Sequence, residues 1–356
     1  MAQDFTVDRN SPKWVLGADG YLKEYANDEP AIEFNADGSY KGVLVEPQSV
    51  NLCLWSEDFT QSGDWVLNLD PTVTANTGTA PDGTQTADRL RAGATGGQIQ
   101  QVISGTSGTT YTVSFYIRRI TGTGTINIRA VENINTPVTI TNNWEKYSVT
   151  ATSTSTTIRI GIRVETDGDE VEIWGAQLEE SPIATSYIPT TTGAVTRLKD
   201  DIYLTSASSL IGQTEGTLFI EVDWQGESVQ NQHLLEVSDG TANNRIIILN
   251  LVSTDELRMF AQSNGSIETS QGESSTVYSG IQKIAFAYKQ NDCELYRNGS
   301  SISTDTTVDL SSLGTLTDVE FQQGSVGNNQ ANMWIRAVAL FTTRLSDAEC
   351  EALTTI

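Results

Sequence analysis

The side chains able to do acid–base or nucleophilic chemistry are few and scattered. His233 is the only histidine, and it lies in an apolar, strand-like stretch with no serine or cysteine nucleophile motif beside it. A catalytic triad needs a base and a nucleophile together, so we interpret His233 as a structural or an exposed residue. Cys53, Cys293 and Cys350 are widely spaced, which favours neither a full disulfide framework nor a zinc site.

Two carboxylates alternate along one expected strand. Glu221 and Asp223 point to the same face of that strand because successive side chains alternate. Glycosidases need two opposed carboxyl groups, one of which acts as an acid. The next position on the same face is Gln225, so the acid–base partner is missing. We therefore predict no catalytic residues, and that the protein is not an enzyme.

Arginines give the most informative pattern. Several expected strands place apolar residues on one side and arginines on the other, in a chain that is otherwise strongly acidic. Planar guanidinium groups and a tyrosine ring suit sugar hydroxyls, carboxylated glycans or an acidic neighbouring chain. The alternative is that these arginines pair with acidic residues of an adjacent domain or of the N-terminal arm. Trp65 and Trp144 are either sugar-stacking rings or core residues. The residues expected on the polar face are Tyr116, Arg118, Asn127, Arg129, Arg159 and Arg163.

The elements that position these side chains are β-strands. Short runs rich in Val, Ile, Thr, Tyr and Phe alternate with period two and are separated by polar turns, a pattern typical of antiparallel sandwiches. Helical periodicity is almost absent; Ser346 and Glu349 form a capping box that predicts one helix over residues 346–353. Asn298 and Gly299 predict a type I′ hairpin turn. The residues expected in the core of the first sandwich are Val113, Phe115, Ile117, Ile126, Ile128, Ile158, Ile160 and Ile162.

Charge and composition exclude several classes of partner. The 356 residues carry 45 acidic and 21 basic side chains, a formal charge of −24. Such a surface repels phosphate backbones, so we expect no nucleic acid partner. No apolar run approaches the ~20 residues that cross a bilayer, so we expect no membrane insertion. The N-terminal residues lack the basic and apolar regions of a signal peptide.

Several segments resemble a known domain. Together they resemble the carbohydrate-binding-module-like jelly roll of tailed-phage structural proteins, over roughly residues 42–197. The segments that resemble its end are residues 174–179 (WGAQLE), 184–189 (ATSYIP) and 195–197 (VTR). Those that resemble its opening are residues 42–47 (GVLVEP), 55–59 (WSEDF), 80–83 (APDG) and the pairs 51–52 (NL) and 87–88 (AD).

The last third is similar to laminin-G or concanavalin-type sandwiches. The segments that carry this resemblance are residues 216–224 (GTLFIEVDW), 293–299 (CELYRNG), 334–341 (WIRAVALF) and 345–350 (LSDAEC). The expected organisation is all-β, with two antiparallel β-sandwiches. We expect an extended N-terminal arm over residues 1–48, a jelly roll over 49–190 and a laminin-G or concanavalin-like sandwich over 191–356.

Calcium is the ion that these resemblances favour. Sandwiches of both types often hold one near a sheet edge, and calcium takes hard oxygen ligands. The candidates are Glu57 and Asp58 near the start of the jelly roll with Glu170 and Glu172 near its end. A solvated acidic rim explains the same four carboxylates. We expect no other cofactor.

The resemblance implies a bacteriophage virion protein made in the host cytoplasm and displayed on the particle. It would be a capsid decoration, a head fibre or a tail receptor-binding protein that binds host-surface glycans or other virion proteins without turnover. A homo-oligomer, such as a trimer, fits that role. The alternatives are a polysaccharide-degrading tail enzyme with a concanavalin-type catalytic sandwich and a purely architectural virion subunit.

Overall fold

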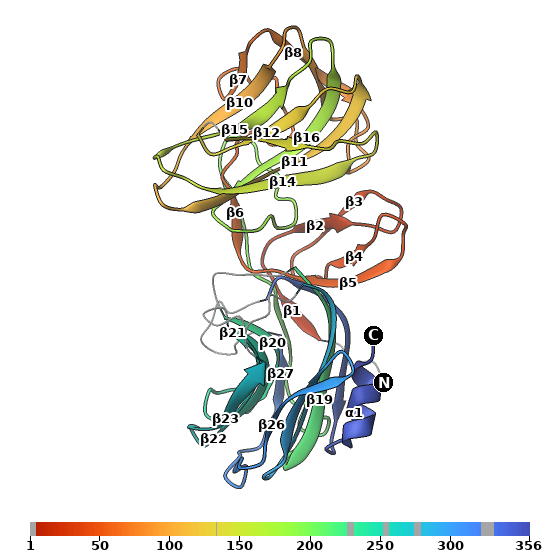
Figure 1. Ribbon diagram of the computed structural model, residues 1–356, viewed down its shortest axis with the longest axis vertical. Coiled ribbons are helices and arrows are strands. Elements are labelled where there is room, and N and C mark those ends of the chain that lie inside the picture. Colours follow the sequence, from red (N-terminus) through yellow and green to blue (C-terminus); the bar gives the residue numbers. More distant parts are fainter. Residues whose placement is uncertain (1–4, 133, 226–230, 252–255, 274–278, 322–330) are drawn as a thin grey trace.

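Two β-sandwiches lie at opposite ends of an elongated molecule, and the hairpin of β2 (Lys13–Leu16) and β3 (Leu22–Tyr25) and strand β6 (Ser49–Asn51) lie between them (Figure 1). The computed structural model describes residues 5–132, 134–225, 231–251, 256–273, 279–321 and 331–356. Every strand pair in these residues is antiparallel, which confirms the all-β class. Within the same residues, no helix is long and apolar enough to cross a membrane.

The first sandwich is a jelly roll made of two five-stranded sheets. The first sheet contains, in spatial order, β13 (Ile134–Val138), β12 (Ile126–Ala130), β15 (Thr157–Val164), β10 (Gly97–Ser104) and β7 (Trp65–Asn68). The second sheet contains β14 (Glu145–Thr152), β11 (Thr110–Thr121), β16 (Glu170–Glu179), β9 (Ala87–Ala92) and β8 (Pro71–Gly78). In Figure 1, β14 and β11 lie on the side of the jelly roll that faces the rest of the molecule.

The core of the jelly roll is the one that alternation predicts. Its apolar side chains come from both sheets and are fully buried, because each strand turns every second residue inward. All eight residues expected there, from Val113 to Ile162, have no exposed surface. Cys53 is also buried as a free thiol among these residues, as are Cys293 and Cys350 in the second half of the chain.

The second sandwich has two seven-stranded sheets. One contains β1 (Thr6–Asp8), β18 (Asp201–Leu204), β27 (Asp318–Glu320), β20 (Gln232–Ser238), β21 (Arg245–Leu251), β22 (Glu256–Ser263) and β23 (Ser266–Glu273). The other contains β26 (Ser300–Asp305), β25 (Cys293–Arg297), β24 (Gly280–Lys289), β19 (Glu215–Trp224), β28 (Met333–Phe341), β5 (Tyr40–Val45) and β4 (Ile32–Phe34). Apolar side chains of both sheets meet in one buried core.

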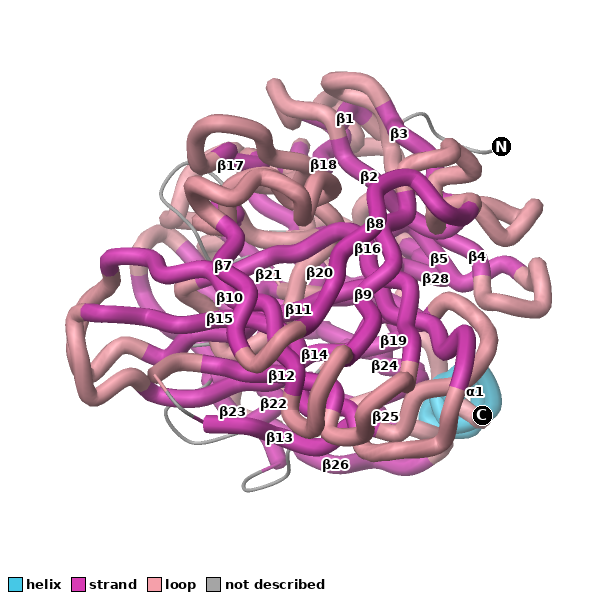
Figure 2. Tube along the Cα trace, turned by 90° about the horizontal axis from the view of Figure 1, so that it is seen from above, coloured by secondary structure: helices cyan, strands magenta, loops and turns pink. Residues whose placement is uncertain are grey.

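The outer face of the second of these sheets is covered by helix α1 (Asp347–Thr354), which Figure 2 shows at one side of the molecule. Cys350 of the helix packs on Phe219 and Tyr296 of the sheet. The N–H of Ser346 donates to the Glu349 carboxylate at 2.8 Å, as the capping box predicts. The hairpin between β25 and β26 turns at Asn298 and Gly299, whose φ angles of 49° and 84° confirm the predicted turn.

The described part of the expected N-terminal arm, residues 5–48, is not extended away from the sandwiches, and this expectation is corrected. The segment forms five strands, including the hairpin of β2 (Lys13–Leu16) and β3 (Leu22–Tyr25). Strand β1 pairs with β18 and β5 pairs with β28, so the N-terminal residues extend both sheets of the second sandwich. Figure 2 shows β4, β5 and β28 side by side, as their pairing requires. Pairing between residues nearly 300 positions apart leaves no local sequence signal.

The connection between the two sandwiches runs from the end of β16 to the start of β18. Its only strand is β17 (Val195–Arg197), which pairs with β6 (Ser49–Asn51). The Pro-, Thr- and Gly-rich residues expected to separate two β-dense regions therefore lie between the sandwiches. Strand β6 precedes the jelly-roll strands in the sequence and β17 follows them, so their pairing brings together the points where the chain enters and leaves the jelly roll.

Candidate functional site

One outer face of the jelly roll collects arginines and side-chain amides, and we call it the arginine–amide face. It is the side of the β13-β12-β15-β10-β7 sheet that points away from the core. Strand register places Asn127, Arg163, Gln98 and Asn68 in one row across the sheet. The next row brings Asn135, Arg129, Gly161 and Gln100 together, and Arg159 follows Gly161 on the same side of β15. The arginine–amide face consists of Asn68, Gln98, Gln100, Asn127, Arg129, Asn135, Arg159 and Arg163.

Gly161 is the central position of this face, and its lack of a side chain matters. A Cβ built there would lie 2.1 Å from the carbonyl oxygen of Ile99, closer than any side chain tolerates. Arg129 and Gln100 lie on the two strands that flank Gly161. The Arg129 guanidinium donates to Gln100 Oε1 at 2.5 Å and to Asn135 Oδ1 at 3.2 Å. The glycine therefore leaves space for a guanidinium to cross the middle strand.

Replacing Gly161 by alanine is expected to destabilise the protein by roughly 1–3 kcal/mol, since the added carbon must push backbone atoms apart. Urea denaturation of the purified protein measures the effect. Gly193→Ala is the matched control, because a Cβ at Gly193 would meet no atom within 4 Å, and its change should stay within about 0.5 kcal/mol. Equal stability of both variants would contradict this account of the face.

The electrostatics of the face favour an anion. Burial lowers the pKa of Arg129, and the nearby positive charges of Arg163 and Arg159 lower it further. Arg163 Nε is paired with Glu165 at 2.7 Å. Among the described residues, no carboxylate forms an ion pair with Arg129 or Arg159. The face thus carries an excess of positive charge on a protein of net charge −24.

Hydrogen-bonding capacity is also left open on this face. Gln98 Oε1 and Asn68 Nδ2 are buried atoms without a hydrogen-bond partner among the described residues. Side-chain amides both donate and accept, as sugar hydroxyls do. A guanidinium presents a planar set of donors that matches a carboxylate. This arrangement can bind a ligand that combines hydroxyls with carboxylates.

Tyr116 and Arg118 do not belong to this face, so the single platform predicted from the sequence is wrong. Both lie on β11, in the opposite sheet of the jelly roll. Arg118 donates to Glu172 at 2.8 Å through Nε, and its guanidinium lies 4.8 Å from the centre of the Trp144 ring. Alternation fixes which side of a strand a residue takes, but it does not fix which of two sheets the strand joins. The other three predicted arginines are together.

The two candidate tryptophans have different places. Trp65 is only 2% exposed and packs in the jelly-roll core against Phe59, with ring centres 4.8 Å apart. It therefore cannot stack on a ligand. Trp144 is partly exposed and donates from Nε1 to the carbonyl of Thr79 at 2.9 Å. Of the two, only Trp144 can meet a ligand.

The four carboxylates proposed for calcium do not form one site. Glu170 and Glu172 are ion-paired with arginines, at 3.5 Å to Arg91 and 2.5 Å to Arg118. Glu57 accepts a hydrogen bond from the Tyr187 hydroxyl at 2.9 Å, and burial raises its pKa. Within the described part of the chain, no group of three or more His, Cys, Asp or Glu side chains is placed to hold a metal ion.

The Asp58 carboxylate is likewise used locally. It accepts hydrogen bonds from Thr60 and Gln61, and these bonds lower its pKa although burial opposes them. The structure thus gives local roles to all four carboxylates, two with arginines and two with nearby hydroxyl, amide and backbone groups.

The residues considered for catalysis also have structural partners. His233 Nδ1 lies 2.8 Å from the Glu236 carboxylate, and its side chain is nearly buried. Glu221 pairs with Arg336 at 2.8 Å on the outer face of its sheet. These contacts give both side chains a local partner.

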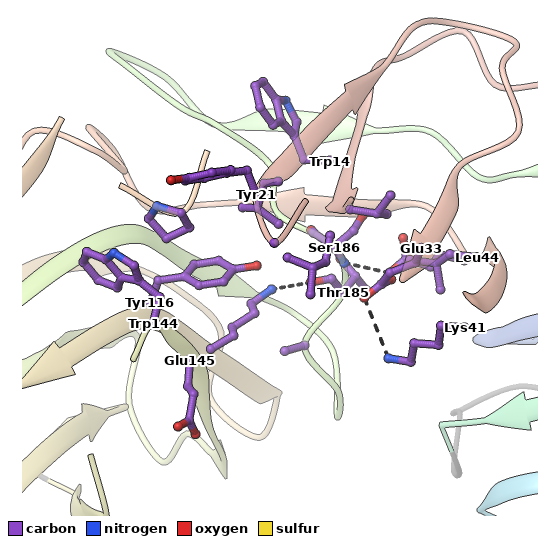
Figure 3. A pocket seen from close by; sticks show the side chains of 18 of the residues that line it. Trp14, Tyr21, Glu33, Lys41, Leu44, Tyr116, Trp144, Glu145, Thr185 and Ser186 are labelled. Carbon is purple, nitrogen blue, oxygen red and sulfur yellow. Dashed lines mark hydrogen bonds and ion pairs between the residues drawn. The ribbon is translucent and has the colours of Figure 1, made fainter. Parts of the chain in front are cut away.

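The structure also contains a pocket that the sequence does not predict. A pocket of about 640 Å³, which we call the junction pocket, lies between the jelly roll, the β2–β3 hairpin and the sheet that contains β28 (Figure 3). Its aromatic lining is Trp14, Tyr21, Tyr116, Trp144 and Trp334. These residues come from four distant segments, so no spacing in the sequence indicates that they meet. By contrast, the sequence does indicate where the amides of the arginine–amide face lie, because Gln98 and Gln100 alternate with apolar Ile99 in β10.

This chain shows only limited similarity to known proteins. No family model matches this sequence, and no curated protein matches it. Among solved structures, the CBM40 of the Ruminococcus gnavus IT-sialidase is 20% identical, covers 42% of this chain and 88% of its own, and has a TM-score of 0.36. Domain 4 of the extracellular arabinanase AbnA from Geobacillus stearothermophilus, in complex with arabinotriose, is 12% identical and covers 49% and 82%, with the same TM-score.

A botulinum neurotoxin type C structure, which concerns interaction with two ganglioside molecules, is 14% identical and covers 44% of this chain and 39% of its own, with a TM-score of 0.36. At such identities and TM-scores, the likeness assigns neither a family nor a ligand to this chain.

Proposed function

We propose that this protein is a non-enzymatic, glycan-binding protein of a virion surface, and that the arginine–amide face binds a glycan that carries carboxylates. The observation that carries the proposal is the group of three arginines around Gly161, set among side-chain amides on a protein of net charge −24. Guanidinium groups bind carboxylates with paired hydrogen bonds, and amides bind hydroxyls. Acidic polysaccharides offer both groups.

The position of the face supports adhesion. It belongs to the jelly-roll sheet whose partner sheet, with β11 and β14, faces the rest of the molecule, so it points away from the second sandwich (Figure 1). Rigid sheets backed by a packed core hold side chains in fixed positions for recognition. The virion placement, in an oligomer on the particle, is supported by the resemblance of residues 42–197 to phage structural proteins. The partners already engaged by His233 and Glu221 support binding without turnover.

Arg159→Ala is expected to weaken binding of acidic glycans by about 10- to 100-fold, because hydrogen bonds to charged groups contribute roughly 1.5–3 kcal/mol. The probe is an array of uronic-acid and sialic-acid oligosaccharides with their neutral counterparts, followed by titration calorimetry of the strongest ligand. Binding should also weaken as salt rises from 0.05 to about 0.5 M, since added salt screens charge attraction.

The matched control is Arg91→Ala, which removes the same charge from an exposed position on β9 of the other sheet. It should leave the affinity within about twofold, because most of the attraction would be local. Equal losses for both variants would show only a general charge effect and would contradict the assignment of the face. If the wild-type protein bound no glycan on the array, the proposed function would be wrong and a purely architectural subunit would be favoured.

A further inference from the structure

The junction pocket is a concave site formed by parts of the chain that are distant in sequence. Figure 3 shows Tyr116 and Trp144 of the jelly roll on one side and Glu33, Lys41 and Leu44 on the other. The β2–β3 hairpin supplies further lining. At about 640 Å³ its volume falls within the roughly 300–1,000 Å³ of small-molecule sites.

The rings of the pocket are available for contact. Tyr21 is 42% exposed, and Trp14, Tyr116 and Trp144 are partly exposed. Trp334 is nearly buried and fixed in place, because its Nε1 donates to Glu33 at 2.8 Å and the Lys41 ammonium lies 3.3 Å from the centre of its ring. One face of a pyranose ring presents C–H groups, which pack on aromatic faces as other apolar groups do.

Polar atoms of the lining lack partners. Trp14 Nε1 and Asn332 Oδ1 are buried and have no hydrogen-bond partner among the described residues. Asn332 is only 2% exposed. Roughly nine in ten buried polar groups in proteins are hydrogen-bonded, so two unpartnered atoms around one pocket are informative. One donor N–H and one acceptor match the rim of hydroxyls on a sugar ring.

The charges of the pocket compensate one another. Its lining has three basic side chains and three acidic ones. Lys41 lies 3.7 Å from Glu33 in an ion pair, Arg118 is paired with Glu172, and the Lys146 ammonium donates to the carbonyl of Thr185. Unlike the arginine–amide face, the pocket has no excess of positive charge to attract an anion. An uncharged ligand fits this balance.

We propose that the junction pocket is a second ligand-binding site and that it takes an uncharged sugar, stacked on Trp144 and bonded through its hydroxyls to Trp14 and Asn332. The site is distinct from the arginine–amide face, which lies on the opposite sheet of the jelly roll. It does not depend on the function proposed for that face. Because three parts of the chain form it, the site exists only in the folded full-length chain.

The test uses the full chain and a set of neutral probes: methyl glycosides and di- to tetrasaccharides of glucose, galactose, mannose and N-acetylglucosamine. Binding is measured by tryptophan fluorescence and by titration calorimetry. For the probe that binds, Trp144→Ala should reduce the affinity at least tenfold. Trp14→Phe keeps a ring but removes the N–H, and it should reduce the affinity about three- to tenfold. Neutral-sugar binding should change less than twofold between 0.05 and about 0.5 M salt, since no net charge is involved.

Phe260→Ala is the control, because Phe260 is a partly exposed ring on β22, outside the pocket. It should leave the affinity unchanged. The proposal is overturned if no neutral probe binds, or if binding survives both Trp144→Ala and Trp14→Phe. Trp14→Phe preserves most of the packing, so it keeps the test decisive if Trp144→Ala does not fold. Loss of acidic-glycan binding alone would count against the proposed function and not against this site.

Discussion

Asp200→Ala is expected to lower the free energy of unfolding by about 3–5 kcal/mol, the range typical of removing one partner from a buried ion pair. Asp200 lies in a cluster of five charged residues between the two sandwiches, and each side chain is at most 2% exposed. Its carboxylate accepts from Arg9 at 2.8 Å and from Lys13 at 2.5 Å. The members of this buried ionic cluster are Arg9, Lys13, Glu46, Arg197 and Asp200.

The cluster joins segments that are distant in sequence. Arg9 and Lys13 come from the N-terminal residues, Glu46 follows β5, and Arg197 and Asp200 lie between the sandwiches. The Asp200 carboxylate also accepts the backbone N–H of Glu46 at 2.8 Å. Without Asp200, three basic side chains would remain with one carboxylate in a fully buried site. An uncompensated buried charge costs several kcal/mol, so the N-terminal segment should separate from the rest of the molecule more readily.

Urea denaturation at pH 7 measures the loss, with Glu215→Ala as control. Glu215 pairs with Lys289 at 3.0 Å, but both side chains are about a third exposed or more, and such pairs contribute about 0–1 kcal/mol. Asp200→Asn keeps the shape and removes the charge, so it should resemble Asp200→Ala. If the asparagine variant were as stable as the wild type, charge compensation would not be the reason for the effect.

The strands and the first core could be predicted because their signal is local. Ile158, Ile160 and Ile162 alternate with Arg159, Gly161 and Arg163, and this alternation alone decides which residues are buried. The helix was predicted for the same reason, since the capping box of Ser346 and Glu349 lies within four residues.

What could not be predicted depends on contacts between distant segments. Strand β5 reads as a short apolar run, and only Trp334 and its neighbours in β28 show which sheet it joins. Arg118 was grouped with Arg159 because both alternate with apolar residues, although their strands belong to different sheets. The junction pocket required Trp14 and Trp144 to meet, and nothing near either residue indicates this. The local sequence pattern predicts which side of a strand a residue lies on. A site formed by several distant elements can be recognised only from the tertiary structure.

Acid is expected to destabilise the protein through Glu46, by about 3 kcal/mol between pH 5 and pH 2. Burial alone would raise the pKa of this carboxyl, but the charges of Arg197 and Lys13 outweigh it, and with hydrogen bonds from Ser186 they lower the pKa to about 2, compared with an ordinary value of 4.5. In the unfolded chain Glu46 therefore takes up a proton near pH 4.5, while in the folded protein it resists protonation until about pH 2. The stabilisation is fully present above pH 4.5 and is lost as the pH falls towards 2. At about 1.4 kcal/mol for each pH unit, the difference corresponds to about 3 kcal/mol.

Glu46→Gln isolates this contribution from that of the other carboxylates. The variant should be less stable than the wild type at pH 7, because Lys13 loses the partner that lies 3.0 Å away. Its stability should then fall less between pH 5 and pH 2, so that the two proteins converge in acid. Urea denaturation at half-unit pH steps gives both curves, and their difference removes the effect of every other titrating group. Parallel curves over this pH range would mean that Glu46 is not held in its charged form by the buried ionic cluster.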